Sequence, residues 1–222
     1  MNTDLSQWTA RPRPDDTPME GRFVTVEPIV DDRRFDELFE AFAADNGDMW
    51  RWLAYGPFGD AQDFRRFAEG FYFTDDPKFH AVVPKETGRA AGVAALMRIV
   101  PADGVMEIGH IALSPSLQRT PATTEMQYLM MRRTFDELGY RRYEWKCNSR
   151  NEPSKRTAAR LGFSYEGLFR QHMVTKGENR DTAWFSVTDG DWPALKAAFE
   201  AWLSPENFDG DGRQIRSLES FR

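Results

Sequence analysis

The segment 107–124, EIGHIALSPSLQRTPATT, constrains the fold of this 222-residue chain more than any other. Residues 107–113 are apolar apart from two titratable side chains, which predicts a buried central strand. A Ser-Pro pair ends this strand, and a helix predicted to reach about Leu138 follows. A strand that enters a helix through a short loop directs the unpaired amides of the first helical turn beyond its own end. The segment therefore predicts an anion-binding site.

Composition and cysteine usage restrict the class of protein. Hydrophobic residues make up 41% of the chain, enough for a sizeable core. No apolar run approaches the ~18 residues that a membrane span needs. The single cysteine, Cys147, excludes an internal disulfide framework. Because the N-terminal stretch also lacks an apolar signal core, we expect a cytoplasmic protein without a membrane partner.

The titratable residues argue against two further classes. The three histidines and the cysteine lie far apart in sequence without metal-ligand spacing, so we expect no metal site. The formal net charge of -6 disfavours nucleic acid as a partner and favours an amine-bearing one. The sequence does not set the oligomeric state, and we allow for a monomer or a homodimer.

Hydrophobic periodicity and turn residues predict the order of the elements. We expect helices within 31–73 and at 122–138, 152–161 and 192–202, and strands at 22–28, 79–84, 90–100, 105–113, 141–147, 163–175 and 181–187. Short connections predict antiparallel hairpins, whereas the strand–helix–strand unit in the middle predicts a parallel pair with a right-handed crossover. The fold class is therefore α/β, with an α+β mixed central sheet flanked by helices. A ligand is expected where the pairing changes.

One domain accounts for all predicted elements. We expect residues 1–20, rich in Pro, Asp and Arg, to form an extended or disordered arm. Residues 21–203 form the domain, and residues 204–222 form a polar tail. The segment 50–73 is rich in aromatic residues, which belong either to the core or to the wall of a ligand pocket.

Two segments carry motifs. The first runs from Leu113 to Glu125 and contains the QRTPATT loop. The second runs from Asn151 to Gly167 and follows the pattern N-x-x-S, then L-G-F, then E-G. On these residues the chain resembles the GCN5-related N-acetyltransferase superfamily. Within it, the chain is similar to the RimJ/RimL-type ribosomal-protein N-terminal acetyltransferases. The order of elements agrees over residues 22–203, whereas both tails lie outside the resemblance.

The resemblance implies an acyl-CoA N-acyltransferase fold and direct acetyl transfer from acetyl-CoA, the cosubstrate, to a primary amine. The acceptor would be a protein N-terminus, as in the RimJ/RimL branch, or a small molecule. Ser154 would give its proton to the CoA sulfur. The residues implied for CoA binding are the backbone of Ile111, Ala112 and Leu113, the pyrophosphate loop with Gln118, Arg119, Thr120, Ala122, Thr123 and Thr124, and Asn151.

The pyrophosphate loop departs from the family pattern Q/R-x-x-G-x-G/A. Pro121 and Thr123 stand at the glycine positions, and Pro121 has no N–H to donate. Proline is nonetheless favoured at the first position of a helix, where the missing donor costs little. We expect a working but altered phosphate site in which the hydroxyls of Thr120, Thr123 and Thr124 are replacement donors. The alternative is a non-catalytic acyl-CoA-binding module.

The general base is the second departure. The branch places a carboxylate on the strand after E-G, where this chain has Met173, and His172 points to the opposite face if that strand is regular. Glu107 and His110 are substitutes on the central strand. Their spacing puts them on opposite faces, so only one is expected to reach the cleft. His110 is the better base at neutral pH. The alternatives are a packed core histidine and a solvated glutamate.

Two further residues have structural explanations. Asn151 is well placed to cap the helix that follows it, which is compatible with a catalytic Ser154. Cys147 has no paired histidine within sequence reach, so we expect it to be structural rather than nucleophilic.

Overall fold

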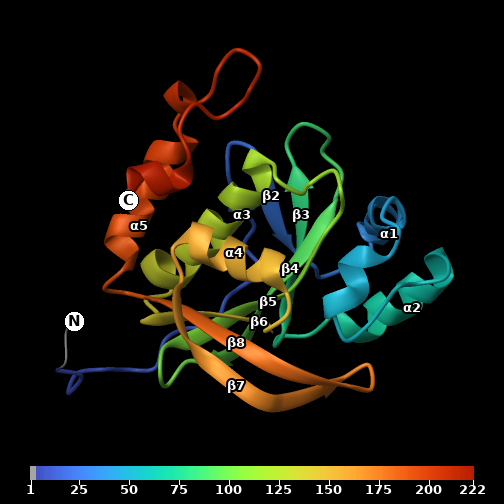
Figure 1. The fold of residues 1–222 in the computed structure, drawn as a ribbon, viewed down its shortest axis with the longest axis horizontal. Helices are drawn as coiled ribbons and strands as arrows, with labels where there is room; N and C mark the ends of the chain where they lie inside the picture. The colour runs from blue at the N-terminus through green and yellow to red at the C-terminus, as the bar shows by residue number, and fades with distance from the viewer. Residues whose placement is uncertain (1–3) are drawn as a thin grey trace.

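The computed structural model describes residues 4–222, which build one eight-stranded sheet with helices on both faces (Figure 1). The order across the sheet is β1-β2-β3-β4-β5-β6-β8-β7. The strands are β1 Met19–Glu20, β2 Val24–Pro28, β3 Lys78–Pro84, β4 Gly92–Val100, β5 Val105–Leu113, β6 Arg142–Asn148, β7 Ser164–Thr175 and β8 Glu178–Thr188. The predicted mixed α/β class is confirmed.

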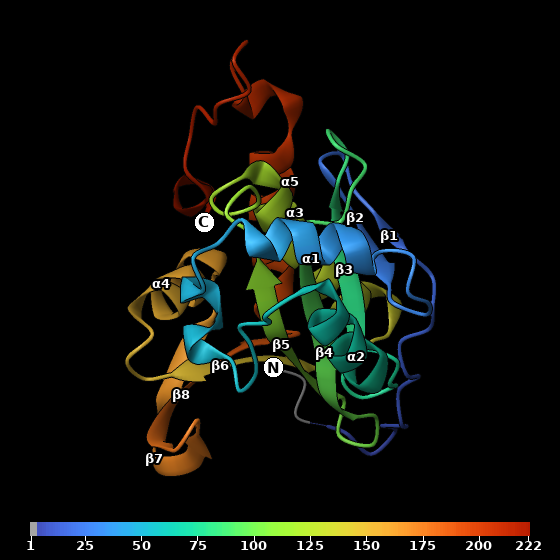
Figure 2. The same cartoon turned by 90° about the vertical axis from the view of Figure 1, so that its right-hand side faces the viewer.

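Two helical layers cover the sheet (Figure 2). One face carries α1 Phe35–Ala43, the 3-10 turn η1 Asp48–Trp52 and α2 Ala61–Phe71. The other carries α3 Pro121–Arg132 with its π-helical extension η2 Arg133–Glu137, α4 Glu152–Leu161 and α5 Trp192–Leu203. Two short turns, η3 Pro205–Asn207 and η4 Leu218–Phe221, end the chain. Within residues 4–222, no helix is both long and apolar enough to span a membrane.

Strands β5 and β6 form the one parallel pair among the described strands, and they part after four paired residues. The ladder joins Val105–Ile108 to residues 142–145, ending at the pair Ile108 and Trp145. Beyond Ile108, β5 pairs with β4 but no longer with β6. This edge of β5 therefore has backbone N–H and C=O groups available to an extended ligand, which can bind as an added strand.

Two β-bulges break the alternation of side chains next to this opening. In β5, two residues lie opposite one residue of β4, and His110 adopts a φ of 50°. In β7, three residues lie opposite Asp181 of β8, and Gln171 adopts a φ of 51°. The Asp181 carboxylate accepts the Gln171 backbone N–H at 2.7 Å, which holds the second bulge in place. A bulge turns the residues that follow it to another face.

Both ends of the described chain pack against the sheet domain. The predicted arm 1–20 begins with three residues outside the described part. From residue 4 it makes a turn at residues 6–7, runs without regular structure along the domain and ends in β1, and the indole of Trp8 donates to the carbonyl of Ala102 at 2.7 Å. At the other end Leu218 is buried, and the buried side chain of Asn207 donates to the carbonyl of Trp202 at 2.9 Å. These contacts join both terminal segments to the domain.

Candidate active site

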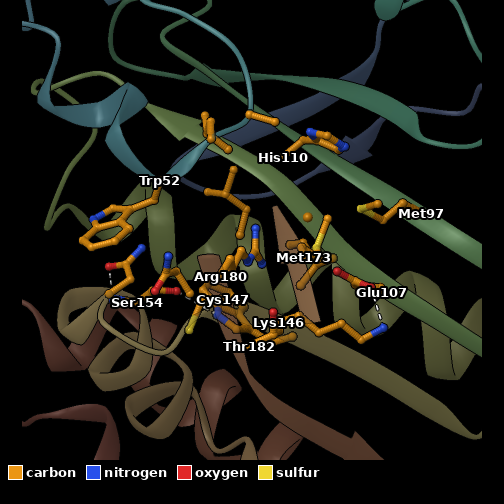
Figure 3. A pocket seen from close by; sticks show the side chains of 18 of the residues that line it. Trp52, Met97, Glu107, His110, Lys146, Cys147, Ser154, Met173, Arg180 and Thr182 are labelled. Atoms are coloured by element: carbon orange, nitrogen blue, oxygen red, sulfur yellow. Dashed lines mark hydrogen bonds and ion pairs between the residues drawn. The ribbon is translucent and has the colours of Figure 1, made fainter. Parts of the chain in front are cut away.

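A cavity of about 290 Å³ lies where β5 and β6 part (Figure 3). Side chains reach it from η1, β4, β5, β6, α4, β7 and β8. Its size is at the lower end of ligand pockets, which run from about 300 to 1,000 Å³. Its titratable and polar lining includes Arg98, Glu107, His110, Lys146, Asn151, Ser154, His172, Arg180 and Thr182. The three predicted catalytic residues and Asn151 thus share one cavity.

The start of α4 positions Ser154. Asn151 is the N-cap of this helix, and its side-chain oxygen accepts the backbone N–H of Ser154 at 3.1 Å. The indole N–H of Trp145 donates to Ser154 Oγ at 3.0 Å. Because an indole nitrogen only donates, Ser154 accepts here, and its own O–H is left to act as a donor, with the thiol of Cys147 as its hydrogen-bonding neighbour in the cavity wall. Asn151 therefore caps α4 and places the hydroxyl.

Glu107 is buried, not solvated as one sequence alternative had it. Its side chain is 6% exposed, and Oε2 accepts from Arg98 at 3.0 Å and from Lys146 at 2.7 Å (Figure 3). Lys146 also pairs with Glu144 and lies 3.8 Å from the centre of the Trp184 ring. The two cations both bind the same carboxylate oxygen of Glu107. Glu107 thereby holds Arg98 and Lys146 at the cavity.

His110 lines the same cavity as Glu107, so the prediction of opposite faces is wrong. The bulge at His110 breaks the period-two alternation on which that prediction depended. Its Nδ1 lies 3.2 Å from the hydroxyl of Tyr55, and its ring packs against those of Phe71 and Phe79. Burial, with a smaller effect of Arg98, lowers the pKa of His110 to about 4. The imidazole is therefore neutral at pH 7.

His172 also faces the cavity, so its predicted orientation away from Met173 is wrong as well. The bulge at Gln171 brings both side chains into the lining. His172 Nδ1 lies 2.9 Å from the hydroxyl of Thr182, which orients the ring. Burial and the nearby cations Arg98, Arg180 and Lys146 lower its pKa. At neutral pH His172 thus presents an uncharged imidazole that can accept a proton.

The predicted cosubstrate strand lies along the unpaired edge of β5. Ile111 lines the cavity, whereas the side chain of Ala112 is buried in the core beneath α1 and α2. The carbonyl of Leu113 accepts the side-chain amide of Gln118 at 3.0 Å, so Gln118 ties the loop to the strand end. The backbone of 111–113 thus stays suited to pairing with an extended group such as pantetheine.

The loop before α3 uses its threonine hydroxyls internally, which corrects the prediction that they replace the missing glycine amides. Thr120 is the N-cap residue of α3 and Pro121 occupies the first turn. The hydroxyls of Thr120 and Thr123 both donate to the carbonyl of Leu117, at 2.7 and 2.5 Å. Thr124 is buried and accepts from Arg160 at 3.1 Å. The first-turn amides, including those of Ala122 and Thr123, are the groups in this loop that remain predicted to bind an anion.

Arg119 and Cys147 are the two remaining residues discussed from the sequence, and only Cys147 lines the cavity. Arg119 adopts a φ of 63° in the loop, a conformation that usually favours glycine. Cys147 is buried in the cavity wall, and burial raises the pKa of its thiol, which makes it a poor nucleophile. No group of three or more His, Cys, Asp or Glu side chains within residues 4–222 could hold a metal ion.

The aromatic segment 50–73 contributes both to the core and to the wall of the cavity. Most of its rings form a core on the sheet face below α1, where Phe64 and Tyr72 are almost fully buried. Trp52, by contrast, faces the cavity together with Met49 and Leu53. Of the lining residues, Trp52, His172 and Arg180 were not among the sequence candidates. No sequence motif marks them, because η1, β7 and β8 bring these residues to one cavity only in the folded chain.

Comparisons with known proteins agree with this geometry. The family model described as an acetyltransferase (GNAT) domain matches residues 24–164. A crystal structure of a GCN5-related N-acetyltransferase from Brucella melitensis is 50% identical, with a TM-score of 0.94, and the match covers 98% of this chain and 99% of that one. A GNAT-family protein from Chromobacterium violaceum ATCC 12472 is 38% identical over 87% of this chain and 97% of its own, with a TM-score of 0.81.

A more distant structure adds a ligand-bound example of the fold. The Microcin C7 self immunity acetyltransferase MccE, solved in complex with acetyl-CoA and AMP, is 21% identical and has a TM-score of 0.67. That match covers 78% of this chain and 98% of the other. None of the curated proteins compared with this chain matches it. The matched domain spans more than half of the chain, and the first structural relative shares half of its residues. The chain is therefore an acyltransferase and belongs to the GCN5-related N-acetyltransferase family.

Proposed function

We propose that this acyltransferase moves the acetyl group of acetyl-CoA to the primary amine of a small molecule, by direct attack of the amine. The observation that carries the proposal is the juxtaposition of the Ser154 hydroxyl and the unpaired edge of β5 in one cavity. The edge binds an extended pantetheine as an added strand, and the amides opening α3 bind the pyrophosphate. These two features suit acetyl-CoA and orient its thioester towards Ser154.

Ser154 and the backbone carry out the chemistry at the thioester. The amine nitrogen forms a bond to the carbonyl carbon while the carbon–sulfur bond breaks. Ser154 donates its proton to the departing sulfur, because the indole of Trp145 leaves its hydroxyl free to donate. The amine loses a proton in the same reaction, so a base is required on the other side of the cavity.

We assign the proton-accepting role to His172, with Glu107 and His110 as the alternatives. One oxygen of Glu107 already accepts from two cations. His110 is packed among aromatic rings, and its pKa of about 4 makes it a weak base. His172 is partly exposed and is held by Thr182, and its neutral ring faces the cavity. It therefore combines access to the amine with the required protonation state.

The pH dependence of the rate distinguishes these three residues. Only the unprotonated base is active, so kcat/KM falls as the pH drops through the pKa of the base. Because the pKa of His172 is lowered, this acidic limb is expected below pH 6.5. We expect His172→Gln to remove the limb, and His110→Gln and Glu107→Gln to retain it. A limb that disappears in one of the latter two variants instead would transfer the role to that residue.

On the side of the cavity next to η1, the β7–β8 turn is bonded to the facing segment, which favours a small amine over a protein N-terminus. Lys176 in this turn donates to the carbonyls of Trp50 and Gly56, at 3.0 and 2.9 Å. These bonds link the hairpin to the η1 segment across the cavity. A polypeptide needs an open groove to enter, whereas a small molecule fits an enclosed space. The RimJ/RimL resemblance supports the protein N-terminus as the second candidate.

Binding and turnover measurements test the proposal together. We expect calorimetric titration to show acetyl-CoA binding with one site per chain, and a panel of small amines to release free CoA thiol. The same panel contains peptides with free N-termini, and turnover of peptides alone would favour the second candidate. Binding without turnover of either class would indicate an acyl-CoA-binding module. If millimolar acetyl-CoA does not bind, all three functions are excluded.

A further inference from the structure

A second cavity of about 250 Å³ adjoins the first, and its lining is strongly basic. Trp52, Asn148 and Arg180 belong to both linings, so the two spaces meet at these side chains. The second cavity lies between η1, the loop after β6 and the β7–β8 hairpin. Four cations, Arg51, Arg150, Lys176 and Arg180, line it against one carboxylate, Glu178. This local excess of positive charge contrasts with the net charge of -6 for the whole chain.

The cations of this basic cavity differ in how they are paired. Arg150 forms an exposed ion pair with Glu178 at 2.9 Å. Lys176 is bound by the carbonyls of Trp50 and Gly56, which do not neutralise it. Arg51 lies over the ring of Trp52, with its guanidinium carbon 4.9 Å from the ring centroid. Three of the four cations therefore have no carboxylate partner in the described chain.

Arg180 is the cation of this cavity on which the inference depends most. Among residues 4–222 its guanidinium makes no hydrogen bond and no ion pair, and its Nε is buried without a partner. Removing part of a guanidinium from water without a hydrogen-bond partner is costly, and this partial burial lowers the pKa of Arg180. Such a group is satisfied by an oxyanion, because its planar fork of N–H donors matches a carboxylate or a phosphate in two parallel hydrogen bonds.

We propose that Arg180 and the basic cavity bind an oxyanion, a carboxylate or a phosphate, carried by the same small molecule that presents the acceptor amine. The inference rests on the proposed function and names the acceptor class as an amino acid or a related amine that bears an anion. Arg180 lines both cavities, so an anion beside it keeps the rest of the molecule next to His172 and Ser154. Apolar side chains, including Trp52, Met97 and Met173, are available to the body of the acceptor.

The phosphates of CoA are expected to bind elsewhere than the anion proposed for the basic cavity. They are assigned to the first turn of α3, and no residue of 117–124 lines either cavity. The basic cavity is formed instead by η1 and the hairpin, the same elements that close the acceptor side. Loss of Arg180 should therefore affect the acceptor and leave acetyl-CoA binding intact.

Matched acceptors test the proposal on the unaltered protein. Pairs that differ by one anion are compared: phenylalanine with phenethylamine, leucine with isoamylamine, and O-phosphoserine with serine. We expect kcat/KM to be about ten- to hundredfold higher for the anionic member of at least one pair, the range of a charged hydrogen-bonded contact. The amino acid pairs and the phosphoserine pair separate a carboxylate site from a phosphate site. Equal or higher rates, in every pair, for the member that lacks the additional anion would overturn the proposal.

Variants of Arg180 identify the residue responsible. Arg180→Gln should raise KM for the preferred anionic acceptor by about ten- to hundredfold and leave unchanged the KM of the counterpart that lacks this anion. Arg180→Lys should recover part of the loss, because it keeps the charge but not the planar fork. Arg66→Gln, on the exposed face of α2, is the matched control and should behave as wild type. Equal losses for both acceptors in Arg180→Gln, with Arg180→Lys no better, would show a structural role only.

The proposed function and the proposed role of Arg180 can be disproved separately. If wild-type protein acetylates no amine of any kind, the proposed function is wrong. If it acetylates amines without preferring anionic ones, the proposed function stands and the role of Arg180 is wrong. The dissociation constant of acetyl-CoA, measured by calorimetry, should be the same in wild type and Arg180→Gln. A weakened acetyl-CoA affinity would instead assign the basic cavity to CoA.

Discussion

Replacing Ser154 by alanine is expected to lower kcat by about 10²- to 10⁴-fold, the range typical of a lost general acid. The physical reason is that the hydroxyl has no substitute donor in this position. Asn151 uses its side chain to cap α4, and the indole of Trp145 points at Ser154 itself. Binding of acetyl-CoA through the β5 edge and the α3 amides does not involve the hydroxyl. The dissociation constant of acetyl-CoA, measured by calorimetry, should therefore change less than about threefold, as expected when no binding contact is lost.

A structural cost accompanies this substitution and has to be measured beside the rate. Alanine leaves the buried indole N–H of Trp145 without its acceptor, which costs about 1–3 kcal/mol of unfolding free energy. The melting temperature should fall by several degrees while the protein stays folded. Ser154→Thr keeps a hydroxyl and should retain much of the rate, and Ser164→Ala, at the exposed start of β7, should match wild type. Equal loss of kcat and of acetyl-CoA affinity would reduce Ser154 to a structural residue.

Replacing Glu125 by alanine is expected to lower the unfolding free energy by about 3–5 kcal/mol, from three backbone donors that lose their acceptor. This buried side chain on α3 accepts the backbone N–H groups of Arg22, Phe23 and Val24, at 2.7, 2.5 and 3.0 Å. It thereby joins the start of β2 to α3. Gly21 lies against the same carboxylate, where a larger residue would collide with it.

Thermal unfolding measures this effect. For a chain of this length, each kcal/mol corresponds to about 2–4 °C, so the melting temperature should fall by about 6–20 °C. Glu69→Ala removes an exposed glutamate from α2 and is the control, with a shift of about a degree or less. Because α3 begins with the pyrophosphate loop, we also expect weaker acetyl-CoA binding in Glu125→Ala. A melting temperature like that of the control would show that water replaces the carboxylate at no cost.

Much of the fold was predictable because local patterns determine it. Hydrophobic runs, turn residues and the spacing of Gly and Pro placed the strands and helices within a few residues of their observed bounds. The parallel pair β5–β6 followed from the strand–helix–strand connection. The cap at Asn151 and the position of Ser154 followed from the N-x-x-S motif, which lies within one helical turn. Each of these features depends on residues close together in sequence.

The sheet face towards which a side chain points was not predictable. The two predictions of this kind failed for the same reason. Glu107 with His110, and His172 with Met173, were assigned to faces by assuming unbroken alternation. Bulges at His110 and Gln171 bring all four side chains to one cavity. A bulge arises where one strand has more residues than its partner between two paired positions. The sequence of a single strand does not contain that difference.

The sequence by itself determined the family and indicated acetyl-CoA as the cosubstrate, with the segment from Glu107 to Thr124 as its proposed site. Only the tertiary structure decided how that segment is used, since the hydroxyls of Thr120 and Thr123 bind the carbonyl of Leu117. Tertiary structure also formed the proposed acceptor site, where Trp52 and Arg180 line the same cavities although more than a hundred residues of chain separate them. A motif records contacts between neighbours in sequence, whereas an unpaired cation in a cavity becomes visible only when the sheet brings distant elements together.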